Sequence, residues 1–197
     1  MASHIDICNM ALGHVGAATR VASITPPDGS VEADRCAMFY PVALSTFIEI
    51  AEPSWARKRV VMTENAVNES SVWLHSYTKP NDCVKPLRVL RAGDVEFKSA
   101  DYEQEGDNIL TDEPTATLLY LWARDDPTRL TPIATVAVSY LLAGLLAGGT
   151  IKGRPGTQVA KAFTDMGVAY ARQAAASDGN ASSGSATFTP SSIAARA

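Results

Sequence analysis

Cysteine, serine and histidine side chains are the first candidates for chemistry, because nucleophilic catalysis needs a Cys or Ser beside a His and a carboxylate. The cysteines Cys8, Cys36 and Cys83 lie far apart, and the three histidines are equally scattered. Their spacing matches no zinc ribbon or Cys-x-x-Cys motif, and no nucleophile elbow or protease signature occurs. The sequence therefore predicts no catalytic or metal site. The cysteines are expected to be free thiols in the core of a protein that is assembled in a reducing compartment.

Carboxylates crowd one stretch of the chain and could supply the acid pair of a glycoside hydrolase. They alternate along expected strands and around a turn, which places them on a solvated face. No calcium loop occurs, and the glycine-rich residues 148–153 resemble a phosphate loop only in composition. We therefore predict no cofactor, and an acidic face that is solvated or repels DNA; its members are Asp101, Glu103, Glu105, Asp107, Asp112 and Glu113.

The densest basic cluster is Arg57, Lys58 and Arg59. Two interpretations stay open: contacts to DNA phosphates, or a charge group on a surface or interface. The net charge of −4 and the pI of about 5.4 give no global basic field. This balance argues against a conventional DNA-binding protein.

The length of 197 residues and the hydrophobic fraction of 46% suit one domain, or one domain with an appendage. The N-terminus lacks a basic region followed by an uninterrupted apolar run, so no signal peptide is expected. The most apolar stretch, residues 133–146, is shorter than the roughly 20 residues of a membrane span. We expect a buried helix there and no membrane insertion.

Apolar periodicity predicts four helices. The first covers about Ile5 to Leu12, and the second runs from Val31 to Glu52 with a kink or break near Ala37 caused by Pro41. The third covers residues 130–146 and ends at Gly148-Gly149. The fourth covers about 157–175 and carries one apolar face, formed by Val159, Ala162, Phe163, Met166, Ala169 and Tyr170.

Period-two alternation in the middle of the chain predicts short strands at about 72–77, 87–90, 95–102, 109–110 and 117–123. The fold class expected is therefore α+β: a helical bundle of residues 1–59 and 130–177, with a small antiparallel sheet inserted at 60–129. Residues 178–197 are of low complexity and are expected to form an extended, flexible C-terminal tail. Its Phe188, Ile193 and Arg196 leave open a disordered tail or a segment that orders on a partner.

Several short motifs follow one another in a fixed order. The long helix carries Cys36, Tyr40 and Pro41, and Trp55 follows with Arg57 and Lys58 after it. An aromatic strand then enters a Pro-x-Asp-Cys turn at Tyr77, Pro80, Asp82 and Cys83. The ILTD segment (109–112), an apolar strand with a tyrosine (118–121) and an alanine- and leucine-rich helix (136–147) complete the series.

In this order and spacing, residues 3–176 resemble the head-to-tail adaptors of short-tailed bacteriophages, also called tail tubular protein A. The resemblance implies a non-enzymatic virion protein of the tail or neck, assembled in the host bacterial cytoplasm. Its copies would form a dodecameric ring between the portal and the tail nozzle protein. Tail fibres could attach there, and double-stranded DNA would pass through the lumen without sequence recognition.

The C-terminal end of the adaptor family often reads Trp followed by Ala-Arg, and Ile193 to Arg196 occupy that place here. The resemblance thus suggests that Phe188, Ile193 and Arg196 contact the portal. Two alternative functions stay open: a connector or head-completion protein of a long-tailed phage, and a cell-wall-degrading virion enzyme built on the acidic segment.

Overall fold

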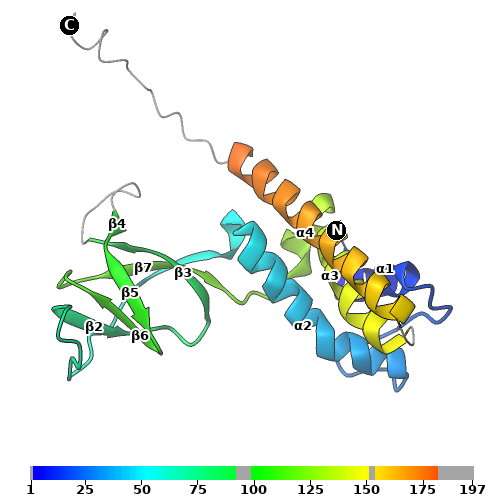
Figure 1. Cartoon of the computed structure of the whole chain (residues 1–197), viewed down its shortest axis with the longest axis horizontal. Coiled ribbons are helices and arrows are strands. Elements are labelled where there is room, and N and C mark those ends of the chain that lie inside the picture. The colour runs from blue at the N-terminus through cyan, green and yellow to red at the C-terminus, as the bar shows by residue number, and fades with distance from the viewer. Residues whose placement is uncertain (1, 92–98, 151–153, 182–197) are drawn as a thin grey trace, which may run out of the picture.

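The structure, a computed structural model, describes residues 2–91, 99–150 and 154–181. The described chain has two parts, with the helices gathered at one end and the strands at the other (Figure 1). The helices are α1 (His4–His14), α2 (Val31–Ala51), α3 (Pro132–Thr150) and α4 (Arg154–Ala181). This arrangement confirms the predicted α+β fold class.

Side-chain caps begin the first two helices. Ser3 accepts a hydrogen bond from the Asp6 backbone N–H, and the Asp6 carboxylate accepts one from the Ser3 backbone in return. Ser30 caps α2 by accepting from the Ala33 backbone N–H at 3.2 Å. Such caps satisfy N–H groups that have no partner within the helix.

Helix α2 is continuous through Pro41, so of the kink or break predicted near Ala37, the break does not occur. Pro41 lies on the exposed side of the helix, whereas Cys36, Tyr40 and Leu44 are buried on the opposite side. A proline removes one backbone hydrogen bond, and the buried stripe, which extends on both sides of Pro41, holds the two halves in one helix.

Helix α3 is the central helix of the bundle and contacts α1, α2 and α4. It continues through Gly148 and Gly149 to Thr150, beyond the predicted end, although both glycines are exposed and have a low helix propensity. By length and composition its 18-residue window from Pro132 to Gly149 could also span a membrane. However, 61% of that window is buried inside the chain, as in the core helix of a bundle.

Helix α4 packs against α3 through small residues, on a side of the helix other than the apolar face named from the sequence. Gly167, Ala171 and Ala174 are buried, whereas Met166 and Tyr170 are 48% and 37% exposed. A Cβ built at Gly167 would lie 2.7 Å from Leu141 Cγ on α3. The backbones therefore approach closely along the glycine and alanine side, and this approach turns the larger apolar residues outward.

The strands form two small antiparallel sheets in place of the single sheet predicted. One has the order β1-β7-β3-β4 and the other β2-β6-β5. The strands are β1 (Arg57–Val61), β2 (His75–Thr78), β3 (Cys83–Leu90), β4 (Ser99–Ala100), β5 (Tyr102–Glu105), β6 (Asn108–Thr111) and β7 (Thr117–Trp122).

Two strands differ clearly from the sequence-based expectations. The basic triplet forms most of β1, which pairs with β7 from Arg57↔Leu121 to Val61↔Thr117. Sequence reasoning missed β1 because charged residues dominate it and all but one of its residues are exposed. Strand β2 begins only at His75, since the preceding residues form an irregular segment. Part of the strand expected at 95–102 lies outside the described residues.

The two parts of the chain share a boundary through the end of the larger sheet. Leu121 of β7 and Ala56 are fully buried within the helical core. A second core lies among the sheets around Tyr77, Val89 and Tyr120. Strands β1, β3 and β7 therefore extend the bundle directly into the β-rich part.

Candidate functional site

The structure joins two motifs that the sequence singled out separately. Lys58 of β1 places its Nζ atom 2.6 Å from Asp82 Oδ2, in the Pro-x-Asp-Cys turn. The Tyr120 hydroxyl donates to Asp82 Oδ1 at 2.8 Å. The turn itself is closed by the Cys83 N–H, which donates to the Pro80 carbonyl at 3.0 Å. Asp82, within the turn, thus accepts hydrogen bonds from side chains of two strands, β1 and β7.

Electrostatics favours the charged forms of this pair. The hydrogen bond from Lys58 lowers the pKa of Asp82, and the same bond raises the pKa of Lys58. Lys58 Nζ also lies 5.1 Å from the centre of the Trp122 ring, and the Arg124 guanidinium lies 5.3 Å from that ring. These contacts are within cation–π range.

A second charged contact ties the sheet to the end of α2. Glu52 caps α2 in the left-handed region, with φ of 45°, and its Oε1 accepts from Lys85 Nζ at 2.6 Å. Its backbone carbonyl accepts from the Arg57 guanidinium at 3.2 Å. Strands β1 and β3 are therefore both attached to the same helix end.

These contacts bear on the two interpretations of the basic triplet, DNA contact or surface charge group, for Lys58 and Arg57. Lys58 is paired with Asp82 and Arg57 with a carbonyl, so neither is presented as an unoccupied cation. The described geometry favours a charge group that joins elements over a contact to DNA phosphates.

The other predicted motif residues are distributed through both cores. Cys36 and Tyr40 are buried in the helical core, where the His4 ring meets Tyr40 edge-on at 5.2 Å. Hydrogen bonding with Cys36, together with burial, raises the pKa of the Cys8 thiol. Tyr77 is buried in the sheet core, and its hydroxyl donates to the Glu113 carbonyl at 2.6 Å. Cys36, Tyr40 and Tyr77 therefore pack within the two cores.

Trp55 lies half-buried in the short 3-10 helix Ser54–Ala56 that follows α2. Beside it, the Ser54 backbone N–H and hydroxyl donate to the Asp178 carboxylate at 2.8 and 2.9 Å. Helix α4 therefore extends into residues 178–181, which the sequence assigned to the tail, because Asp178 is held by Ser54. Phe188, Ile193 and Arg196 lie outside the described residues.

Several acidic residues of the proposed enzymatic alternative accept hydrogen bonds, each from a different donor. Glu103 accepts from Trp73 Nε1 at 3.0 Å, and Glu113 accepts from Arg91 Nε at 2.6 Å. Asp112 accepts from the Leu74 backbone N–H at 3.1 Å. Across residues 2–91, 99–150 and 154–181, no group of three or more His, Cys, Asp and Glu side chains could hold a metal ion.

The bundle exposes apolar side chains on two different helices, which sequence reasoning missed. On α2, Val31, Met38 and Val42 are 60%, 66% and 51% exposed. On α4, Met166 and Tyr170 are exposed beside an aromatic stack. In that stack the Tyr140 ring lies 5.6 Å from Tyr170 and 4.1 Å from His14. Aromatic residues and methionine are enriched at protein interfaces.

The signal for these surfaces was present in the sequence. The apolar face predicted on α4 and the exposed positions of α2 both follow a helical period. The period alone cannot say which of two apolar faces a helix buries, and the glycine and alanine side of α4 was the less apolar of the two.

A scan against protein-family models finds no matching family, and a search of curated proteins finds no significant match.

Proposed function

We propose that this chain is a structural virion protein, the subunit of a head-to-tail adaptor ring in a short-tailed bacteriophage. Its copies join the portal to the tail nozzle protein and form part of the channel through which DNA is ejected. The ring is dodecameric, is assembled in the host bacterial cytoplasm and has no enzymatic role. The ordered series of motifs from Cys36 to the helix at 136–147 supports this proposal by resemblance.

One observation carries the proposal: the helical bundle presents apolar side chains to solvent on two separate helices, α2 and α4. A chain that worked alone would gain stability by covering such residues, since burial of apolar surface contributes about 25 cal/mol per Å². Exposed apolar residues grouped on ordered elements are typical of surfaces that bind other proteins. A ring subunit needs such surfaces toward its neighbours.

The elongated arrangement also suits an adaptor. The bundle and the sheets lie at opposite ends of the folded molecule (Figure 1), so one end can contact the portal ring while the other faces the nozzle. The contacts of Glu52 with Lys85 and Arg57 attach strands β3 and β1 to the end of α2 and so join the two ends. A fixed connection of this kind suits a protein that joins two assemblies.

Charge supports a lumen that does not retain DNA. Twelve copies at −4 each give −48 for the ring. A negative lumen repels the phosphate backbone, so DNA slides without sticking. Glu103 and Glu105 are exposed on β5 and are the best-placed residues for this role.

The experiment that tests the proposal measures mass. Native mass spectrometry of the purified chain, alone and mixed with the portal protein, is expected to show a complex of portal with about twelve adaptor chains. The proposal is wrong if the chain never associates with the portal. Hydrolysis of purified peptidoglycan, lost on Glu103→Gln, would support the enzymatic alternative instead.

A further inference from the structure

We propose that the C-terminal segment of this chain docks on helix α2 of the same chain, with Ile193 in a hollow beside that helix and Arg196 paired with Asp125. The proposal concerns the free chain and goes beyond the ring function proposed above. It rests on three observations: the lining of the hollow, the side chains that the C-terminal segment carries, and the place where α4 ends.

The hollow is lined mainly by apolar side chains. It lies between α2 and the segment that joins β7 to α3, and its volume is about 90 Å³. Its apolar lining residues are Pro41, Leu44, Ile48 and Ala123. Since an apolar cavity of about 150 Å³ accommodates a benzene ring, this smaller hollow suits an aliphatic side chain better than the ring of Phe188.

Charge beside the hollow favours a basic partner. Asp125 lines the hollow, its side chain is 66% exposed, and its Oδ1 lies 2.9 Å from His4 Nε2. An ionised carboxylate accepts several hydrogen bonds, so Asp125 has room for a further donor. The neighbouring Arg124 is paired with Asp126 at 3.3 Å and lies over the Trp122 ring. A second basic side chain can therefore pair with Asp125 while Arg124 keeps its own partners.

The C-terminal segment carries both matching side chains. In residues 182–197, Ile193 is the only large aliphatic residue and Arg196 is the only charged one. Three positions separate them, which is a span of at most about 10 Å in extended chain. An aliphatic group and a cation at this spacing match an apolar hollow that has a carboxylate in its lining.

The end of α4 lies close enough for docking within one chain. Asp178 accepts hydrogen bonds from the Ser54 backbone N–H and hydroxyl, so the C-terminal ends of α2 and α4 lie side by side (Figure 1). Helix α2 has 21 residues and is therefore about 32 Å long. The twelve positions from Ala181 to Ile193 span up to about 40 Å. Ile193 can thus reach any point along α2 of its own chain.

The tether favours docking within one chain over docking on a second copy. A short tether holds a segment at an effective concentration on the order of millimolar, about a thousandfold above that of separate chains at micromolar concentration. One consequence rests on the proposed function. Residues that are proposed to contact the portal are held on the free chain, and binding to the portal must release them.

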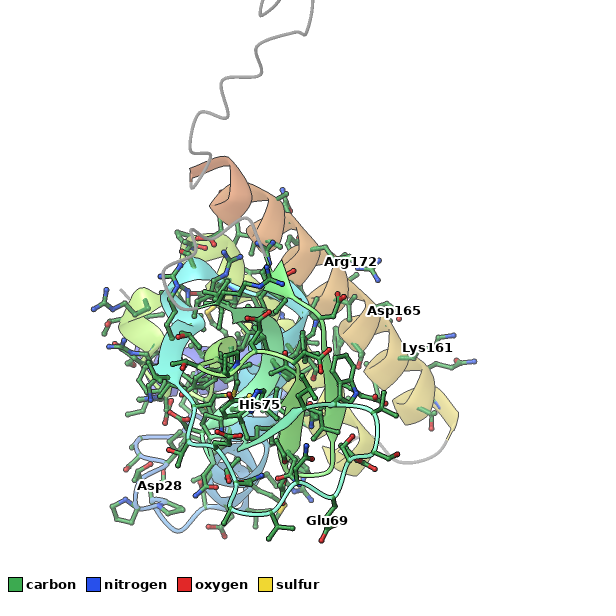
Figure 2. The ribbon with its side chains drawn as sticks, turned by 90° about the vertical axis from the view of Figure 1, so that its left-hand side faces the viewer. Asp28, Glu69, His75, Lys161, Asp165 and Arg172 are labelled. Atoms are coloured by element: carbon green, nitrogen blue, oxygen red, sulfur yellow. The ribbon has the colours of Figure 1, made fainter. Side chains whose placement is uncertain are left out.

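Intramolecular cross-linking tests the contact. A short bismaleimide is expected to link Ser45→Cys, which lines the hollow, to Ser192→Cys, beside Ile193, within one monomer. Arg172→Cys with Ser192→Cys is the matched control, because Arg172 is about 14 Å from the end of α4 and points away from the body (Figure 2). Peptide mass spectrometry should show at least about tenfold more linked monomer than in the control. The native cysteines are the same in every variant, and a chain with Ser192→Cys alone measures their background.

Substitutions in the segment test the two side chains that the proposal names. Added to the double-cysteine chain, Ile193→Asp should reduce the cross-link to the control level, because a carboxylate does not enter an apolar hollow. Arg196→Glu should lower the yield severalfold, whereas Arg196→Lys should keep it. Arg196→Glu together with Asp125→Lys should restore it, because the pair of opposite charges is remade.

Protection of the hollow gives an independent readout. In a chain with Ser45→Cys alone, deletion of residues 182–197 should speed the labelling of this thiol by a maleimide severalfold. Arg172→Cys alone should be labelled at the same rate with and without the segment. Equal labelling of the thiol at the hollow in both chains would overturn the proposal.

The outcomes separate this contact from the adaptor function. Docking within one chain is wrong if the double-cysteine chain links no more often than the control, or if the linked peptides come mainly from dimers. A chain that links as expected but never binds the portal leaves the contact standing and overturns the proposed function. A chain that binds the portal should lose the cross-link, and an unchanged yield on the portal would overturn the release of the segment.

Discussion

The packing of α3 against α4 makes a sharp prediction, because Gly144 on α3 and Gly167 on α4 leave no room for a methyl group. A Cβ at Gly167 would lie 2.7 Å from Leu141 Cγ and 2.9 Å from the Leu141 backbone nitrogen. A backbone atom cannot move aside as the end of a side chain can. Gly167→Ala is therefore expected to push the two helices apart.

The magnitude follows from two opposing effects. Alanine stabilises a helix interior by about 1 kcal/mol relative to glycine, and overpacking a close contact costs about 1–3 kcal/mol. Gly148 on α3 is the matched control, because a Cβ there meets nothing within 4 Å. Gly148→Ala should gain the propensity alone, so Gly167→Ala should be less stable than Gly148→Ala by about 1–3 kcal/mol.

Urea unfolding followed by far-ultraviolet circular dichroism measures both variants, and thermal midpoints check them. In a chain of this size 1 kcal/mol corresponds to about 2–4 °C. If Gly167→Ala stabilises the chain as much as Gly148→Ala does, the helices do not approach closely along the glycine side. The outward position of Met166 and Tyr170 would then lose its explanation.

Three further predictions follow from the site. Asp82→Asn should lower the free energy of unfolding by roughly 1 kcal/mol or less, because the pair with Lys58 is partly exposed and screened. Since the pKa of Asp82 is lowered in the fold, this loss of stability should be present at neutral pH and vanish as the pH falls through that pKa. Urea unfolding at several pH values measures it. Deleting residues 182–197 should leave the chain folded, because the Asp178–Ser54 bonds are kept, but should weaken portal binding; normal binding would show that Phe188, Ile193 and Arg196 are dispensable. Replacing Asp101, Glu103 and Glu105 by Lys should slow genome ejection, and unchanged ejection kinetics would exclude an acidic lumen face.

The elements that could be predicted from the sequence are those with a strong local signal. Ser3 and Ser30 cap the first two helices as side-chain chemistry predicts, and the apolar period marks the buried stripe of α2. The apolar and aromatic residues around Tyr77 and Leu118 mark strands, and the four residues from Leu118 to Leu121 are all buried. The α+β class follows from these signals together.

The differences arise where tertiary contacts decide. Strand β1 is carried by pairing with β7 and has no apolar pattern of its own. Helix α4 extends to Ala181 because Asp178 is bonded to Ser54, which lies 124 positions away in the chain. The partnership of Lys58 with Asp82 likewise depends on how the strands pair. No local pattern contains these long-range choices.

Electron microscopy of intact virions that carry this product tests the central claim most directly, namely that the chain joins two assemblies by burying apolar surface between its copies. The account predicts a twelvefold collar between portal and nozzle into which the bundle and sheets fit. A neck that contains no ring of this protein would contradict it.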